Sequence, residues 1–149
     1  MAESLLKGKS LLIVDDEPDV LDILEEEIRD ACSDCTIDRA TTYDKAAELL
    51  TSKNYTLAVL DIMGVRGFDL LEIAVKRNIL AVMLTAHALS PAALTESHTL
   101  GARAYLPKDK LPEIVSYLED VLKHDFDSGW KYLREKLGDH FPASFWDYI

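Results

Sequence analysis

Residues 11–16, LLIVDD, set a pattern that the chain repeats, because four apolar residues run directly into two carboxylates. Three later apolar runs also lead into a polar side chain, namely Asp61, Thr85 and Lys108. If each run is a parallel strand, its C-terminal end faces the crevice in which open α/β sheets bind ligands. The pattern therefore predicts that these polar residues meet at one edge of a sheet.

The residue types in this predicted cluster indicate phosphoryl-transfer chemistry. The carboxylates of Asp15, Asp16 and Asp61 would repel one another at one sheet edge. A hard divalent cation bound through oxygen is their natural partner, which favours Mg²⁺, with Mn²⁺ as an alternative. The hydroxyl of Thr85 and the ammonium of Lys108 suit the oxygens of a phosphoryl group.

The predicted elements are a strand and then a helix, repeated five times. Strands are expected at residues 10–14, 36–40, 57–60, 81–84 and 103–106. Helices are expected to begin at Pro18, after Thr42, near Phe68, at Ser90–Pro91 and near Ile114. Strict alternation is typical of an α/β fold, in which a parallel sheet has helices on both faces.

The C-terminal segment, residues 125–149, is different because it holds seven of the twelve aromatic residues of the chain. So many aromatic side chains are unlike a disordered tail. One helical stripe with a glycine cap is formed by Phe126, Trp130, Leu133, Leu137 and Gly138. We therefore expect a helical extension that packs on residues 1–124 or across a dimer.

Composition excludes several classes of protein. The formal net charge of −11 argues against a general affinity for the DNA backbone. No apolar stretch has the length of a membrane span, and residues 1–7 lack a signal-peptide core, so a cytoplasmic protein is expected. We interpret Cys32 and Cys35 as reduced cysteines at a helix end, because no second pair completes a zinc site.

Four segments match a known family in order and spacing: LLIVDDEPD at 11–19, LAVLDIM at 57–63, VMLTA at 82–86 and GARAYLPKD at 101–109. Over about residues 9–123 the chain resembles the receiver domain of response regulators in two-component signalling. The resemblance implies a five-stranded parallel sheet of the flavodoxin-like order 2-1-3-4-5. Residues 1–124 would then be the receiver domain, and residues 125–149 would add a short sixth helix.

The resemblance also implies a role for each site residue. Asp61 would be the phosphoacceptor. Mg²⁺ would be held by Asp15, Asp16, Asp61 and the backbone carbonyl of Met63. The phosphoryl group would be bound or sensed by Thr85, Lys108 and the rotating switch residue Tyr105.

The function implied by the resemblance is a phosphorylation-dependent signalling switch. A sensor histidine kinase or a phosphotransfer protein would supply the phosphoryl group, and an unknown downstream protein would receive the signal. Neither direct DNA binding nor membrane association is expected, and a homodimer is compatible with the sequence. The chain would not be an enzyme for other substrates, since it would catalyse only its own phosphorylation and dephosphorylation.

Three alternatives are weighed against this function. The first is a pseudo-receiver that binds partners without being phosphorylated. The second is an aspartyl phosphatase of the haloacid-dehalogenase type, which would need an aspartate where Met63 stands. The third is a flavin-binding flavodoxin, which would need a phosphate cradle where residues 15–17 are acidic.

Two positions depart from the family pattern. Val65 stands where a proline is usual, and the loop before Gly67 is about two residues short, which puts the start of the third helix in doubt. Asp109 follows Lys108 where many receivers have a proline. We expect a trans Lys108–Asp109 bond, because a cis bond before a non-proline residue costs roughly 3–4 kcal/mol. His87, two residues past Thr85, is interpreted as a surface residue near the site.

Overall fold

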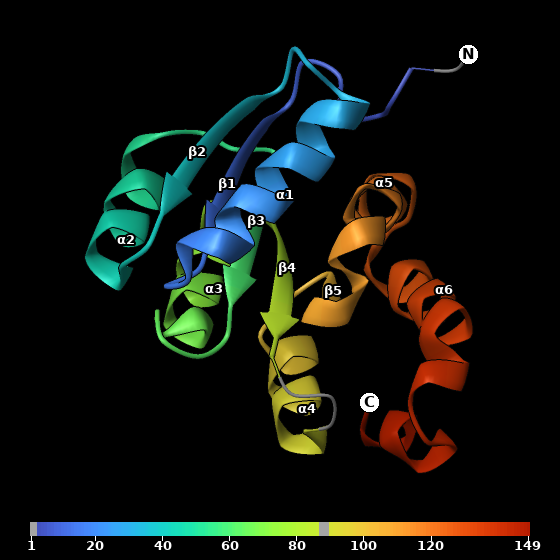
Figure 1. Ribbon diagram of the computed structural model, residues 1–149. Coiled ribbons are helices and arrows are strands. Elements are labelled where there is room, and N and C mark those ends of the chain that lie inside the picture. The colour runs from blue at the N-terminus through green and yellow to red at the C-terminus, as the bar shows by residue number, and fades with distance from the viewer. Residues whose placement is uncertain (1–2, 87–89) are drawn as a thin grey trace.

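The computed structural model describes residues 3–86 and 90–149. Five parallel strands form one sheet in the order β2-β1-β3-β4-β5, which confirms the predicted order (Figure 1). Each strand begins and ends within one residue of its predicted range. The strands are β1 (Ser10–Val14), β2 (Thr36–Ala40), β3 (Leu57–Asp61), β4 (Leu80–Thr85) and β5 (Ala104–Pro107).

Helices cover both faces of the sheet, as predicted. α1 packs against α5, α2 packs against α3, and α4 lies against β5 (Figure 1). The α-helices are α1 (Pro18–Ala31), α2 (Tyr43–Ser52), α3 (Gly67–Lys76), α4 (Pro91–Thr99), α5 (Ile114–Lys123) and α6 (Phe126–Leu137). Three short 3-10 helices are η1 (Lys108–Glu113), η2 (Gly138–His140) and η3 (Ala143–Tyr148).

Several helices begin where the sequence predicts, for identifiable reasons. α1 begins at Pro18, whose missing N–H has no cost at the first helical position. The side chain of Thr42 accepts a hydrogen bond from the backbone N–H of Lys45 at the start of α2. Ser90 caps α4 in the same way, by accepting from the N–H of Ala93.

The core lies on both sides of the central strands. β3 is buried along its whole length, and β1 and β4 are buried after their first residue. This agrees with their continuous apolar runs, which are typical of strands covered on both faces. α4 contributes little to the core, because only Leu94 and Ser97 of this helix are buried.

The C-terminal extension, residues 125–149, packs on the α/β part of the chain (Figure 1). α6 lies beside α5 and β5, and η3 lies beside α4. Trp130, Leu133 and Leu137 are buried, as the predicted stripe requires. Gly138 ends α6 with right-handed helical dihedrals rather than a left-handed cap, because the chain continues directly into η2.

Candidate functional site

The sheet brings the predicted site residues to one edge. Asp61 is the last residue of β3, and its Cα is in register with Leu84 of β4. Thr85 is the last residue of β4 and is in register with Pro107, which immediately precedes Lys108. Asp15 follows β1 directly. The parallel register therefore places these residues together without any long loop.

Three carboxylates form an oxygen-rich cluster at this edge. One oxygen each from Asp15, Asp16 and Asp61 lies within 4.8 Å of the others. Asp15 and Asp61 are buried, whereas Asp16 is exposed. A donor set made only of carboxylate oxygens fits a hard divalent cation such as Mg²⁺.

Lys108 reaches into the same cluster. Its Nζ atom lies 2.8 Å from Asp15 Oδ2 and 3.2 Å from Asp61 Oδ1. The same atom lies 3.6 Å from Glu17 Oε1. Lys108 therefore places one ammonium group beside two buried carboxylates and an exposed one.

The electrostatics of the cluster show how strongly these charges interact. Burial raises the pKa of Asp61 to about 6, and the negative charge of Asp15 adds to this rise. Burial also raises the pKa of Asp15. Burial lowers the pKa of Lys108, but its hydrogen bond to Asp15 and the charge of Asp61 outweigh that effect, so the net pKa is raised. The buried carboxylates are therefore only partly neutralised by Lys108, and a divalent cation would stabilise their charged forms.

The short loop after Asp61 is closed by two glycines whose importance the sequence did not reveal. Gly64 has a φ of 85°, a backbone conformation that residues with a Cβ atom rarely adopt, and it lies against the Asp16 carboxylate. A Cβ atom on Gly67 would collide with the backbone carbonyl oxygen of Asp61. The two glycines therefore allow this loop to pack against the acidic cluster.

The same loop shows where the third helix starts, which the departure at Val65 had left in doubt. Val65, which stands where a proline is usual, is buried. α3 begins at Gly67, whose N–H donates to the carbonyl of Ile62. Met63 is 70% exposed. The role of its backbone carbonyl as a metal ligand stays a prediction.

The predictions for the Lys108–Asp109 bond and for the two cysteines can be compared with the structure. The Lys108–Asp109 bond is trans, as expected, because the described residues contain no cis peptide bond. Cys32 and Cys35 are free and buried, in agreement with the interpretation as reduced cysteines. His87 lies outside the described residues.

Glu17 contacts Lys108, which the sequence pattern did not predict. Its carboxylate is exposed, yet it approaches Lys108, and its backbone N–H donates to Asp15 Oδ1 at 2.9 Å. The acidic run in the sequence was the available signal, but only the fold shows which member of the run faces the lysine.

Comparison with known proteins agrees with this geometry. The family model described as the response regulator receiver domain matches residues 11–119. The chain therefore belongs to the family of response regulator receiver domains. Its general role is that of a receiver in two-component signalling, where phosphorylation acts as the switch. No curated protein matches the chain significantly.

Solved structures share the fold. A CheY-like receiver domain from Methanospirillum hungatei is 27% identical with a TM-score of 0.63, over 77% of this chain and 97% of that chain. A receiver domain of a DNA-binding regulator from Colwellia psychrerythraea is 20% identical with a TM-score of 0.69, over 78% and 99%. The BeF3-activated receiver domain of DrrB, a Thermotoga maritima protein, is 21% identical with a TM-score of 0.65, over 78% and 98%.

The C-terminal extension lies beyond the family match, which ends at residue 119. In the described part of the chain, no helix has the length and apolar character needed to cross a membrane. The expected cytoplasmic location, the partner proteins and the homodimer stay predictions.

Proposed function

We propose that the chain is a signalling switch in which Asp61 accepts a phosphoryl group in a Mg²⁺-dependent transfer. The observation that carries this proposal is the placement of Asp61, a buried carboxylate at the sheet edge. Asp15 and Asp16 flank it, and Lys108 lies 3.2 Å away. A sensor histidine kinase or a phosphotransfer protein would be the donor.

The chemistry follows from the residues at the site. A carboxylate oxygen of Asp61 attacks phosphorus and forms an O–P bond. The bond between phosphorus and the donor breaks, and the donor leaves with its electron pair. The product is an acyl phosphate on Asp61. Asp15, Asp16 and Asp61 would hold Mg²⁺, which supplies charge neutralisation when bound. Such a transfer needs little from the protein beyond positioning and this neutralisation.

Two further residues would bind the transferred group. Lys108 would exchange part of its contact with the carboxylates for an ion pair with phosphoryl oxygens. Thr85 lies beside it at the end of β4 and would donate its hydroxyl to the same oxygens. The chain would act only on itself, and its output would pass through protein–protein contacts.

The charge of the chain supports an output through proteins rather than through DNA. Some similar structures are described as DNA-binding regulators, and that description belongs to those proteins. A formal net charge of −11 disfavours contact with a phosphate backbone in this chain. We therefore infer that the downstream partner is a protein.

Intact-mass spectrometry after treatment with acetyl phosphate tests the proposal. We expect one added phosphate on the wild type with Mg²⁺, and none in EDTA or in Asp61→Asn. Asp69→Asn is the matched control, because Asp69 is an exposed aspartate in the first turn of α3 and should leave the added phosphate in place. A wild-type mass that does not change in Mg²⁺ would contradict the proposal and favour a scaffold that binds partners without phosphorylation.

A further inference from the structure

The C-terminal extension is fixed to the β5 side of the receiver domain by specific contacts. The indole N–H of Trp130 donates to the carbonyl of Ala102 at 2.8 Å, in a buried position. The ring of His98, on α4, lies 5.0 Å from Phe126 and 5.1 Å from Trp130 between centroids. α6 therefore joins α4 to the edge of the sheet.

The end of the extension forms an aromatic cluster, which we define as Phe141, Phe145 and Trp146. The rings of Phe141 and Phe145 stack with centroids 4.5 Å apart, and Trp146 lies perpendicular to Phe145 at 5.3 Å. All three side chains are buried. The hydroxyl of Thr95 donates to the carbonyl of Tyr148 at 3.2 Å, which ties the cluster to α4.

Tyr105 connects this cluster to the acidic site. Its side chain is fully buried in β5, and its ring centroid lies 6.2 Å from that of Phe145. Burial raises the pKa of Tyr105, and an interaction with the Thr85 hydroxyl opposes that rise. The ring therefore faces the extension at one side and a residue of the predicted phosphoryl site at the other.

One buried donor of the aromatic cluster is unsatisfied. Among the described residues, Trp146 Nε1 has no hydrogen-bond partner. A buried donor without a partner disfavours the packed state, since water would satisfy it. Such groups in a native structure call for an explanation, and one explanation is a segment that can be released.

We propose that the aromatic cluster is an intramolecular ligand of the surface formed by α4 and β5, and that a phosphoryl group on Asp61 releases it. The proposal rests on the function proposed above. When Thr85 turns toward the phosphoryl oxygens, the hydroxyl of Tyr105 follows into the space that Thr85 leaves. The ring then withdraws from Phe145. A gap of about 0.5–1 Å removes roughly a quarter to a half of the van der Waals attraction between each affected pair of atoms.

The released segment has the chemistry of a protein-binding element. Large aromatic side chains dominate the centres of protein–protein interfaces, where they fill apolar pockets. Phe145 and Trp146 would become such anchors once they leave α4. The partner that fits them is a protein with an apolar groove that accepts two neighbouring aromatic side chains.

Fluorine NMR of the full chain labelled with fluorotryptophan tests this release, because both tryptophans lie in the extension. Trp130→Phe and Trp146→Phe assign the two resonances. After addition of Mg²⁺ and beryllofluoride, an acyl-phosphate mimic, the bound fluoride resonance reports site occupancy. We expect the Trp146 resonance to move toward its position in the denatured chain, while the Trp130 resonance moves less.

Matched tyrosine variants identify the route of coupling. Tyr105→Phe keeps the ring but lacks the hydroxyl that faces Thr85, so beryllofluoride should bind without moving the Trp146 resonance. Tyr117→Phe is the control, because Tyr117 is another buried tyrosine that lies below Lys136 of the extension. It should retain the full response.

The two proposals fail in different ways. Absence of a bound fluoride resonance in the wild type would overturn the proposed function. A bound fluoride resonance with an unmoved Trp146 resonance, or with movement retained in Tyr105→Phe, would overturn the release and leave the proposed function standing.

Discussion

The two edge strands of the sheet are protected in opposite ways. β5 is buried along its whole length, with α6 of the extension beside it. In β2 only the last residue is buried. An exposed edge strand offers unpaired backbone groups to other chains, and proteins protect it by covering it or by placing charges on it. Here β5 is covered and β2 is charged.

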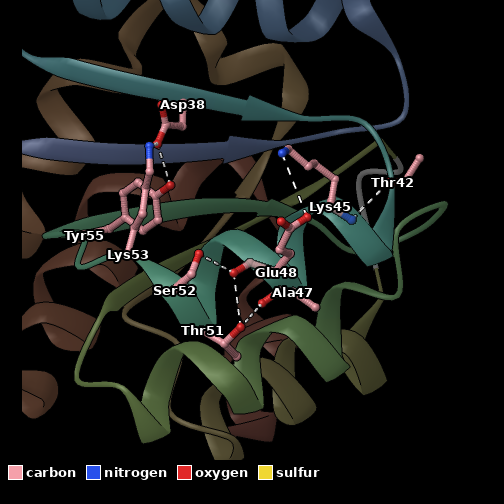
Figure 2. A network of polar contacts seen from close by, with 9 residues as sticks. All are labelled: Asp38, Thr42, Lys45, Ala47, Glu48, Thr51, Ser52, Lys53 and Tyr55. Carbon is pink, nitrogen blue, oxygen red and sulfur yellow. Dashed lines mark hydrogen bonds and ion pairs between the residues drawn. The ribbon is translucent and has the colours of Figure 1, made fainter.

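The β2 edge is held by a polar network that extends to α2 (Figure 2). Tyr55 donates its hydroxyl to Asp38 Oδ2 at 2.6 Å, and Lys53 Nζ lies 3.0 Å from the same oxygen. At the start of α2, the side chain of Thr42 accepts from the N–H of Lys45. These contacts join residues 3, 15 and 17 positions apart in the sequence, all within β2, α2 and the start of the segment that follows α2.

The β5 edge depends on contacts between distant parts of the chain. The hydrogen bond from Trp130 to Ala102 spans 28 residues, and the one from Thr95 to Tyr148 spans 53 residues. The β2 edge is therefore held by polar contacts, including ion pairs from Arg39 to Asp22 and Glu25 of α1, whereas the β5 edge depends on a docked segment. Both edges reach the predicted phosphoryl site, but in different ways. Tyr105 of β5 does so through its side chain, whereas Ala40 of β2 accepts a backbone hydrogen bond from Asp15 at 3.2 Å.

The largest effect is expected from Trp146→Ala. This side chain is 1% exposed, so its removal leaves a cavity below the extension and should lower the free energy of unfolding by about 3–5 kcal/mol. Tyr148→Ala, in the same short helix but 58% exposed, should change it by about 0.5 kcal/mol or less. Urea unfolding followed by circular dichroism measures both. Equal losses in the two variants would show that the aromatic cluster does not stabilise the β5 edge.

A smaller loss is expected at the β2 edge from Tyr55→Phe. The variant removes the hydroxyl that donates to Asp38 and should cost about 1.5 kcal/mol, the lower range for a hydrogen bond to a charged group. Tyr132→Phe is the control, since Tyr132 is partly exposed and its ring stacks on His124. If both substitutions cost the same in urea unfolding, the hydroxyl of Tyr55 has no special role.

The cost of Tyr55→Phe should depend on pH. The hydrogen bond from Tyr55, with a further contribution from Lys53, holds the pKa of Asp38 below its ordinary value of 3.8. A lowered pKa in the folded state stabilises the protein above the unfolded pKa, and this stability is lost as the pH falls through the folded pKa. Wild type and Tyr55→Phe should therefore differ fully at pH 6, and the difference should shrink only as the pH falls below 3.8 and through the lowered pKa of Asp38. A constant difference across that range would contradict the role assigned to the Asp38 carboxylate.

The smallest effect is expected from Lys53→Met. Lys53 is 56% exposed in its ion pair with Asp38, so its loss should cost only about 0.5 kcal/mol and should vanish at 1 M salt. The cost of Trp146→Ala should persist in the same salt, because it comes from packing. A salt-sensitive β5 edge would remove the distinction between the two edges.

The sequence was sufficient for features that depend on local pattern. Continuous apolar runs predicted β1, β3 and β4, and the polar residue after each run predicted Asp15, Asp61 and Thr85. The spacing of the extension predicted which face of α6 is buried. These predictions succeeded because strand ends and helix faces follow from residue periodicity.

The remainder depends on contacts that periodicity does not encode. A helical stripe shows that Trp130 must be buried but not that Ala102 is its partner. Nothing in the spacing of residues 141–149 places Phe145 on Tyr105. The close approach of Gly67 to the Asp61 carbonyl likewise appears only when the loop is folded. The first two are tertiary contacts between distant segments, and the third is a property of the folded loop, so residue periodicity predicts none of them.

Hydrogen exchange with and without Mg²⁺ and beryllofluoride tests whether the site communicates with the β5 edge and not with the β2 edge. We expect faster exchange at residues 91–99 and 138–149 when the mimic is bound, and unchanged exchange at residues 36–55. Asp61→Asn should abolish the difference. Equal changes at both edges, or a change confined to residues 36–55, would contradict the account.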